Sequence, residues 1–312
     1  MTEKENVLNA LRHNGKAEWI PNIRDSVVFL LPQLARDKIK EGTDWFGVKW
    51  KDYTPLNNPL FENVADWKKH IVFPDLDAIN WEAEARQLRP TLDRENKAVW
   101  LFLSQGLFDR LQSFMGFENG AVSFYDDPEA TLELIEALTG FRIKLMEKLI
   151  DCYDPDIVDY RDDFGTQISL FISPEIYDTF FKPYIKRIGD YIHSRGKVFV
   201  QHCCGKVDEL VGRFVEIGAD TWDSVQPCCD LPAIYREFGD KIGFSSNMDL
   251  QKFQFCTEEE AREVVRYYID TMGGRRNLVL FDMFPLDLPL NPDILTDEIR
   301  RYGRQYCAAH PV

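Results

Sequence analysis

The segment His202-Cys203-Cys204-Gly205 carries the residue types and spacing best suited to chemistry in this chain. It follows an apolar run that predicts a β-strand, in which alternate side chains share a face, so His202 and Cys204 are expected to point the same way. Imidazole nitrogen and thiolate sulfur are zinc ligands, and a catalytic zinc needs a third protein ligand and an open position. Asp282, after the last predicted strand, is one candidate for that place, and Cys256 is another. A buried core histidine beside ordinary thiols is the alternative.

A second polar segment, RDDFGTQ at 161–167, follows another predicted strand. Adjacent carboxylates beside an arginine can share a raised pKa for acid–base work or orient a hydroxylated substrate, so Asp162 and Asp163 are candidate catalytic residues. The alternative is a loop cap with an arginine ion pair. Further amides and aromatic side chains are candidates for binding a substrate at the rim of the predicted sheet: Gln105, Gln167, Asn247, Trp45 and Phe117.

These side chains can form one site only if the strands before them end at a common edge of the sheet. From about residue 97, short apolar or β-branched runs alternate with longer segments of helical period. The expected strands are 98–103, 157–160, 197–201, 220–225, 242–245 and 277–281. The expected helices include 128–150, 207–217 and one that begins at a capping box, Thr257-Glu258-Glu259-Glu260.

Repeated strand–helix units predict a parallel sheet, either closed as a barrel or open and doubly wound. Polar residues follow the carboxyl ends of several strands, as in barrel enzymes, and neither GxGxxG nor GxxxxGK[ST] occurs. We therefore predict an α/β fold with one (β/α)8 TIM-barrel domain over residues 1–312. Its first part, 1–95, is less regular and is expected to lie over the barrel mouth, with a first strand at 19–24 and a hairpin at 45–50.

The charge balance narrows the range of partners. The 312 residues include 37 basic and 52 acidic side chains, a net charge of −15. This excess disfavours nucleic acid and anionic membrane surfaces, so small molecules or proteins are the expected partners. No apolar stretch has the length of a signal peptide or membrane span, which predicts a cytoplasmic location. The odd number of cysteines, 7, predicts reduced thiols rather than a disulfide framework.

Several motifs in order resemble the uroporphyrinogen decarboxylase superfamily, and more closely its corrinoid-linked methyltransferase branch. They are MGFEN at 115–119, YDDPE at 125–129, DDFGTQ at 162–167, ISPE at 172–175, FKPY at 181–184, HSRGK at 193–197 and HCCGKV at 202–207. The resemblance covers nearly the whole chain and is strongest from 107 to 249. It implies a (β/α)8 barrel, in agreement with the pattern of strands and helices.

The resemblance also implies a metal. Members that methylate thiols hold zinc with a His-x-Cys pair and a later cysteine, and His202 and Cys204 match the first two positions. Asp282 stands at the third position, judged by its spacing to Pro289-Leu290. A carboxylate ligand leaves zinc a stronger Lewis acid, which suits an ether oxygen better than a thiol. The stretch at 44–50 resembles the branch that acts on aryl methyl ethers such as veratrol or vanillate.

The implied reaction moves a methyl group from a methoxylated aromatic compound to Co(I) of a separate corrinoid protein. The cobalamin is expected on that partner because the sequence lacks an Asp-x-His-x-x-Gly signature. Porphyrin decarboxylation is disfavoured, because the region 22–26 lacks an arginine-rich motif and the net charge opposes a polycarboxylate. Open alternatives are a metal-independent lyase of the decarboxylase type, methyl transfer from a thiol, amine or alcohol, and a non-enzymatic barrel. A homodimer is also open.

Overall fold

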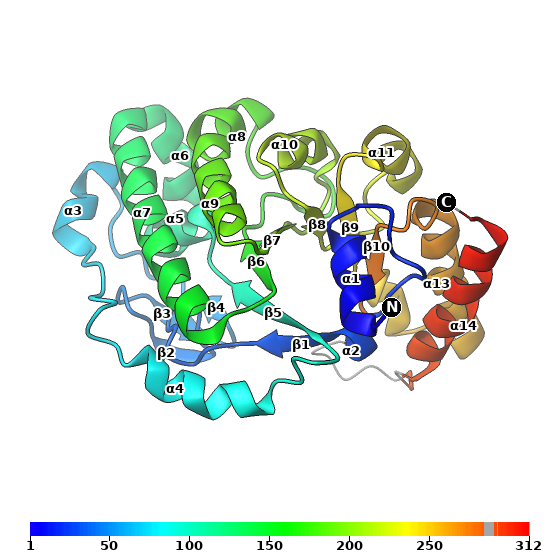
Figure 1. The fold of residues 1–312 in the computed structure, drawn as a ribbon. Helices are drawn as coiled ribbons and strands as arrows, with labels where there is room; N and C mark the ends of the chain where they lie inside the picture. Colours follow the sequence, from blue (N-terminus) through cyan, green and yellow to red (C-terminus); the bar gives the residue numbers. More distant parts are fainter. Residues whose placement is uncertain (284–289, 292, 312) are drawn as a thin grey trace.

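A curled parallel sheet forms the centre of the computed structural model, which describes residues 1–283, 290–291 and 293–311 (Figure 1). In these residues the sheet has seven strands, in the order β1 (Val27–Leu30), β5 (Ala98–Leu103), β6 (Ile157–Arg161), β7 (Val198–His202), β8 (Thr221–Asp223), β9 (Gly243–Ser246) and β10 (Leu278–Leu280). A single parallel bridge between Asn22 and Leu280 brings the chain before β1 to the edge strand β10. The arrangement is consistent with a TIM-like barrel.

The sheet confirms the parallel strand–helix architecture expected from the sequence. All six strands predicted after residue 97 occur, with small differences at their ends. The first strand was predicted at 19–24 but lies at Val27–Leu30, because the helical turn α2 (Ile23–Ser26) intervenes. The Asn22 side chain caps that turn by accepting from the Asp25 amide at 2.8 Å. The described residues thus supply seven strands of the sheet where eight were predicted.

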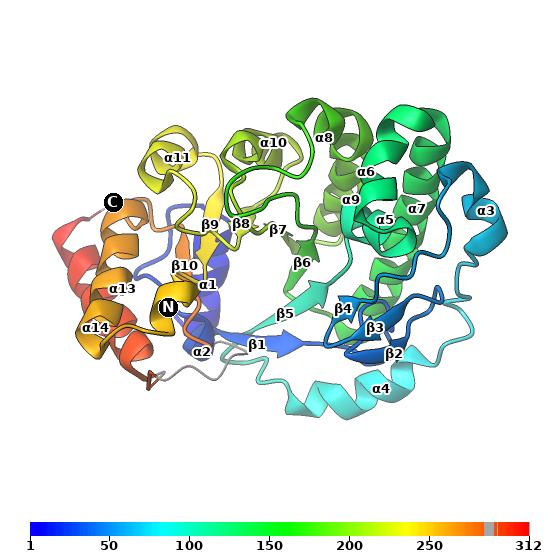
Figure 2. The same ribbon diagram turned by 180° about the vertical axis from the view of Figure 1, so that it is seen from behind.

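Helices cover the outer face of the sheet (Figures 1 and 2). Those after β5 are α5 (Leu107–Met115), α6 (Phe117–Asp126), α7 (Pro128–Tyr153), α8 (Pro174–Phe180), α9 (Lys182–Ser194), α10 (Val211–Glu216), α11 (Leu231–Phe238), α12 (Leu250–Phe253), α13 (Glu258–Met272) and α14 (Asp293–Ala309). The predicted helix at 128–150 is α7, and the predicted capping box at Thr257 begins α13 with both of its hydrogen bonds formed. The predicted helix at 207–217 is a 3-10 turn at 208–210 followed by α10. No helix of the described residues has the length and apolar character to cross a membrane.

Buried apolar side chains form two layers, one on each face of the sheet. The inner layer includes Trp100, Val200 and Phe281, whereas the alternate residues of the same strands pack against the surrounding helices. Helix α1 (Glu3–Leu11) adds Val7, Ala10 and Leu11 to the inner layer. Thr221, the first residue of β8, donates its hydroxyl to the Leu11 carbonyl at 2.6 Å, so α1 packs across the amino ends of the strands.

A small antiparallel sheet lies beyond the carboxyl ends of β1 and β5 (Figure 2). Its strands are β2 (Glu41–Thr43), β3 (Lys49–Lys51) and β4 (Thr54–Pro55), so the hairpin expected at 45–50 is the turn and second strand of this unit. Two short helices, α3 (Trp67–His70) and α4 (Trp81–Leu88), and 3-10 turns at 64–66 and 89–91 lead from it to β5.

Buried charges hold the small sheet in place. Arg110 of α5 is 0% exposed and lies 2.6 Å from Asp44 Oδ2 and 2.7 Å from Asp37 Oδ1. Arg142 of α7 pairs with the other oxygen of Asp37. Because an unpaired buried charge is costly, these contacts fix the segment 37–44 against α5 and α7.

Candidate functional site

His202 and Cys204 meet at the carboxyl end of β7. His202 is the last residue of that strand, and its Nε2 lies 3.3 Å from Cys204 Sγ. Cys203 turns the opposite way, where its sulfur accepts a hydrogen bond from the Phe164 amide at 3.2 Å. Cys204 Sγ also lies 3.3 Å from the hydroxyl of Ser224, which follows β8. The alternation of side chains along the strand therefore produces the imidazole–thiol pair.

Asp223, at the end of β8, orients the imidazole. Its Oδ2 lies 2.5 Å from His202 Nδ1. Burial raises the pKa of Asp223, but His202 and Arg161 outweigh that effect and the net shift is downward, so the carboxylate accepts and Nδ1 donates. Arg161 Nη2 approaches the other ring nitrogen, Nε2, at 3.0 Å.

The tautomer of His202 follows from these two contacts. Burial and Arg161 lower the pKa of His202, whereas Cys204 and Asp223 raise it, and the net direction is well above the ordinary value. The neutral ring is the form that binds a metal, and in it the approach of a guanidinium N–H requires the lone pair on Nε2. The proton of the neutral ring therefore lies on Nδ1, beside Asp223.

Two groups of side chains in the described residues bring at least three metal-ligand atoms within 4.8 Å of one another. The first is Asp163, His202 and Cys204, and in it Asp163 Oδ1 lies 3.7 Å from His202 Nε2. The second is Asp159, His202 and Asp223, all buried inside the sheet. Nitrogen, sulfur and oxygen donors together suit zinc, and the Asp223 contact to Nδ1 is the outer partner that a zinc-binding histidine usually has.

Asp282 lies outside both groups. It is buried after β10, where Oδ1 accepts from the Arg24 amide at 3.0 Å and Oδ2 accepts from the Thr296 hydroxyl at 2.6 Å. Both oxygens thus have partners within the fold. Cys256, the other candidate third ligand, is likewise absent from both groups.

The neighbouring carboxylates Asp162 and Asp163 occupy different environments. Asp162 is 0% exposed and accepts hydrogen bonds from the amides of Phe108 and Asp109 at 3.1 and 2.9 Å, at the start of α5. Gly106, the cap residue of α5, has no side chain to do this, and a Cβ there would lie 2.2 Å from the Asp162 carboxyl carbon. Burial raises the pKa of Asp162 to about 7. Asp162 therefore caps a helix, while Asp163 faces the imidazole–thiol pair.

A cavity of about 420 Å³, here called the mouth cavity, opens beside Arg161 and Asp223, which both contact His202. Its lining residues are Phe29, Phe102, Arg161, Asp223, Asn247, Leu250, Phe281 and Met283. The ring centroids of Phe29 and Phe102 are 4.9 Å apart, and those of Phe29 and Phe281 are 6.0 Å apart. The cavity thus has a continuous aromatic wall next to polar groups, which suits a flat apolar ligand.

The other predicted substrate-binding residues lie elsewhere. Gln105 and Phe117 line a separate cavity of about 310 Å³ together with Asp163. Gln167 Nε2 donates to Gln226 Oε1 at 3.1 Å. Trp45 packs edge-on against Trp81 and Phe141, beside the small sheet. Among the predicted substrate-binding residues, Asn247 lines the mouth cavity.

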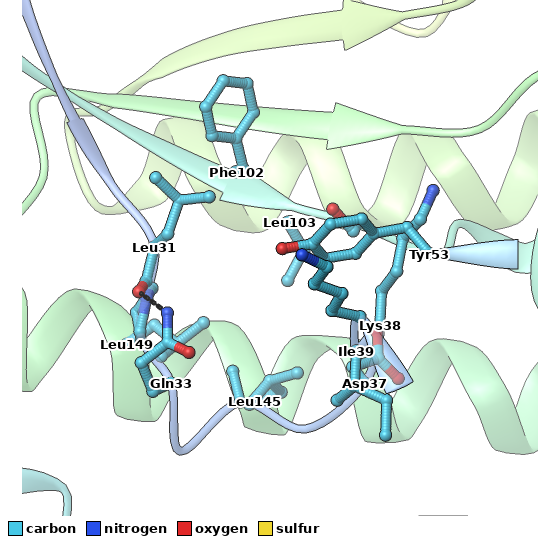
Figure 3. Close-up of a pocket in the computed structure, with 14 residues that line it drawn as sticks. Leu31, Gln33, Asp37, Lys38, Ile39, Tyr53, Phe102, Leu103, Leu145 and Leu149 are labelled. Atoms are coloured by element: carbon cyan, nitrogen blue, oxygen red, sulfur yellow. Dashed lines mark hydrogen bonds between the residues drawn. The ribbon is translucent and has the colours of Figure 1, made fainter. Parts of the chain in front are cut away.

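A third cavity, of about 190 Å³, lies between the segment 31–40 and α7 (Figure 3). Leu145 and Leu149 of α7 form one side, and Leu103 of β5 lies across from them. None of the residues predicted for the site lines this space. It shares Phe102 with the mouth cavity.

Asp159, Asp223 and the three phenylalanines of the mouth cavity are not among the predicted site residues. A signal for Asp159 is present, because it interrupts a predicted strand that is otherwise apolar, whereas the predicted strand around Asp223 contains other polar residues. No comparable signal separates Phe29, Phe102 and Phe281 from the many other phenylalanines of the chain.

Comparisons with known proteins place the chain in a family. Residues 103–280 match the uroporphyrinogen decarboxylase (URO-D) profile, whereas no curated protein matches the sequence. Among solved structures, a methyltransferase from Methanosarcina mazei is similar with a TM-score of 0.72 and 12% identity, over 97% of this chain and 99% of that one. An endo-beta-N-acetylglucosaminidase from Cordyceps militaris has a TM-score of 0.42 and 13% identity, over 98% of this chain and 95% of that one. The first likeness shows a shared fold, and the profile match over more than half of the sequence shows that the chain belongs to the uroporphyrinogen decarboxylase family.

Proposed function

We propose that this protein transfers a methyl group from a methoxylated aromatic compound to Co(I) of a separate corrinoid protein. The observation that carries the proposal is an aromatic-walled cavity whose lining residues Arg161 and Asp223 both contact His202, the imidazole of the imidazole–thiol pair. The methyltransferase from Methanosarcina mazei, which has a similar fold over nearly its full length, supports the choice of reaction class.

The mouth cavity suits a single substituted ring. Its volume of about 420 Å³ falls in the range of small-molecule sites. Phe29, Phe102 and Phe281 offer faces and edges for an aromatic ring, while Asn247 and Arg161 provide hydrogen-bond donors. Holding the ring in one orientation aligns its methyl group with an incoming cobalt, and such alignment lowers the barrier of a displacement reaction.

The proposed metal ligands are Nε2 of His202, Sγ of Cys204 and a carboxylate oxygen of Asp163. Asp163 takes the third place in this proposal because it lies beside the pair, whereas both oxygens of Asp282 are hydrogen-bonded elsewhere. A zinc ion held there would supply Lewis acidity toward the ether oxygen, where negative charge grows as the methyl group leaves. Asp223 keeps the imidazole in the tautomer that leaves Nε2 available.

The cobalt cofactor is proposed to come from the partner. The chain lacks the Asp-x-His-x-x-Gly signature expected of a corrinoid-binding sequence. The candidate ligands sit at the carboxyl ends of the strands, and α1 packs across the opposite ends. The partner would therefore present its cobalt at the mouth.

A metal-independent lyase is the second candidate, and one contact favours it. Arg161 donates to Nε2 of His202, the nitrogen that zinc would need. In a lyase, Arg161 and His202 would bind and polarise the substrate without a metal. Such an enzyme would act without a corrinoid partner, and His202→Ala would leave its metal content unchanged.

The test mixes the purified, zinc-loaded protein with reduced corrinoid protein and a panel of methoxyarenes. We expect the Co(I) absorbance to fall as methyl-Co(III) appears with at least one of them. Phe102→Ala should raise the KM about tenfold, because it removes one aromatic wall of the cavity. Tyr125→Ala is the matched control, since Tyr125 is 74% exposed and lines none of the three cavities described above. Absence of methyl-cobalt with every methoxyarene would contradict the proposal.

A further inference from the structure

Arg161 links the candidate metal ligands to the mouth cavity. Its Nη1 lies 2.6 Å from Asp159 Oδ2, and its Nη2 lies 3.0 Å from His202 Nε2. The guanidinium carbon lies 4.8 Å from the centroid of the Phe102 ring, and the side chain lines the cavity. The side chain is 27% exposed and lines the cavity, so a ligand in the cavity can contact it.

The contact with His202 uses the nitrogen that a metal would need. Asp223 holds the proton of the ring on Nδ1, so Nε2 has one lone pair. That lone pair cannot accept an N–H from Arg161 and bind zinc at the same time. The guanidinium charge also repels a cation at this position. Arg161 and zinc are therefore competitors for one atom of His202.

The cavity offers Arg161 an alternative partner. Asp159 and His202 each accept one N–H in the contacts above, and a guanidinium has about five such donors. Among the described residues that line the mouth cavity, Arg161 is the sole cation. A carboxylate accepts two parallel hydrogen bonds from a guanidinium, one more than the imidazole nitrogen can. An aromatic ring against the phenylalanines can place such a group within reach.

We infer that Arg161 is a positioning residue that couples substrate binding to metal binding. It holds Nε2 of His202 until an anionic substituent on the aromatic ligand draws the guanidinium into the cavity, with Asp159 as its fixed partner. This inference rests on the proposed function for the identity of the ligand, and it narrows the substrate class to methoxylated aromatic carboxylates. By linkage, zinc and the aromatic carboxylate each strengthen the binding of the other.

The experiment measures zinc affinity by competition with a chromogenic chelator, without corrinoid protein. Wild type and Arg161→Met are compared alone, with 3-methoxybenzoate and with methoxybenzene. Methionine keeps the length of the side chain but has no charge and no N–H donor. We expect Arg161→Met alone to bind zinc about tenfold more tightly than wild type. The benzoate should tighten zinc binding to wild type and not to the variant, whereas methoxybenzene should change neither.

Two further variants complete the design. Arg236→Met removes an exposed arginine of α11 that does not line the mouth cavity, and it should behave as wild type. Arg161→Lys keeps a positive charge beside Asp159 but lacks the planar guanidinium, so it replaces the methionine variant if that variant does not fold. In Arg161→Lys, 3-methoxybenzoate should tighten zinc binding less than in wild type. Equal zinc affinity in wild type and the folded Arg161 variant, or a benzoate effect that survives the substitution, overturns the inference.

The zinc-affinity measurement and the methyl-transfer assay can fail independently. If no methoxyarene donates a methyl group, the proposed function is rejected, but the competition between Arg161 and zinc for His202 can still be measured. Methyl transfer with no effect of Arg161 on zinc affinity would reject the inference alone.

Discussion

Replacing Asp162 by alanine tests whether this buried carboxylate caps α5. Its oxygens accept from the amides of Phe108 and Asp109, and Tyr160 donates its hydroxyl to it at 3.1 Å. Gly106 contributes no side chain to the cap. Alanine would leave these three donors without that acceptor, and each unsatisfied buried donor costs about 1–2 kcal/mol. We expect the free energy of unfolding to fall by about 3–5 kcal/mol.

The assay is urea unfolding at pH 8, where Asp162 is ionised, followed by circular dichroism and tryptophan fluorescence. The midpoint should fall at an unchanged m-value, since the surface exposed on unfolding stays the same. Asp163→Ala is the matched control. The Asp163 side chain is 42% exposed and accepts one amide, from Cys204 at 2.7 Å, so its loss should cost about 1 kcal/mol or less.

Two results would refute the capping role. One is an Asp162→Ala protein within about 1 kcal/mol of wild type, because three orphaned donors cannot cost so little. The other is an equal loss in the Asp162 and Asp163 variants, which would mean that burial and capping do not distinguish them. A stable Asp162→Ala protein without methyl transfer would instead support the predicted catalytic role of Asp162.

Three other predictions follow from the site. The pKa of Asp162 is about 7 in the folded chain and about 3.9 in the unfolded chain. Protonation of Asp162 therefore stabilises the fold below pH 4, and this contribution is lost as the pH rises through 7. The fall in the urea midpoint between pH 4 and pH 7 should be smaller in Asp162→Asn than in wild type. Elemental analysis should find less zinc in Asp163→Asn and wild-type zinc in Asp282→Asn, and the reverse pattern would return the third ligand to Asp282. Asp223→Asn should weaken zinc binding about 10–100-fold in chelator competition, because His202 loses its orienting carboxylate; an unchanged affinity would exclude His202 as a ligand in this tautomer.

The strands after residue 97 could be predicted because most are short apolar or β-branched runs between polar segments, which is a local property. The first strand could not be placed this way. The segment 19–24 contains apolar residues, as Val27–Leu30 does, but the helical turn Ile23–Ser26 takes up its end, and within that turn the Arg24 amide donates to Asp282. That contact joins residues at opposite ends of the sequence. Strand position here is therefore set by tertiary structure.

The candidate site likewise combines a local feature with features set by tertiary structure. His202 and Cys204 are two residues apart at the end of one strand, so their proximity follows from local geometry. The residue that lies closest to this pair as a possible third metal ligand depends on how the loops after different strands fold. The sequence predicted Asp282 for this position, whereas the structure places Asp163 beside the pair. Asp162 and Asp163 are adjacent in sequence, but Asp162 faces the start of α5 and Asp163 faces His202, a difference that packing decides.

Helix α1 has a kinetic consequence for the proposed reaction. It packs across the amino ends of the strands, while the mouth cavity and the candidate ligands lie at the carboxyl ends. Methyl donor and corrinoid partner must then use the same entrance. The small molecule has to enter first and the demethylated phenol has to leave last, after the partner has undocked. Turnover would be ordered, and the phenol would inhibit competitively against the aromatic ether.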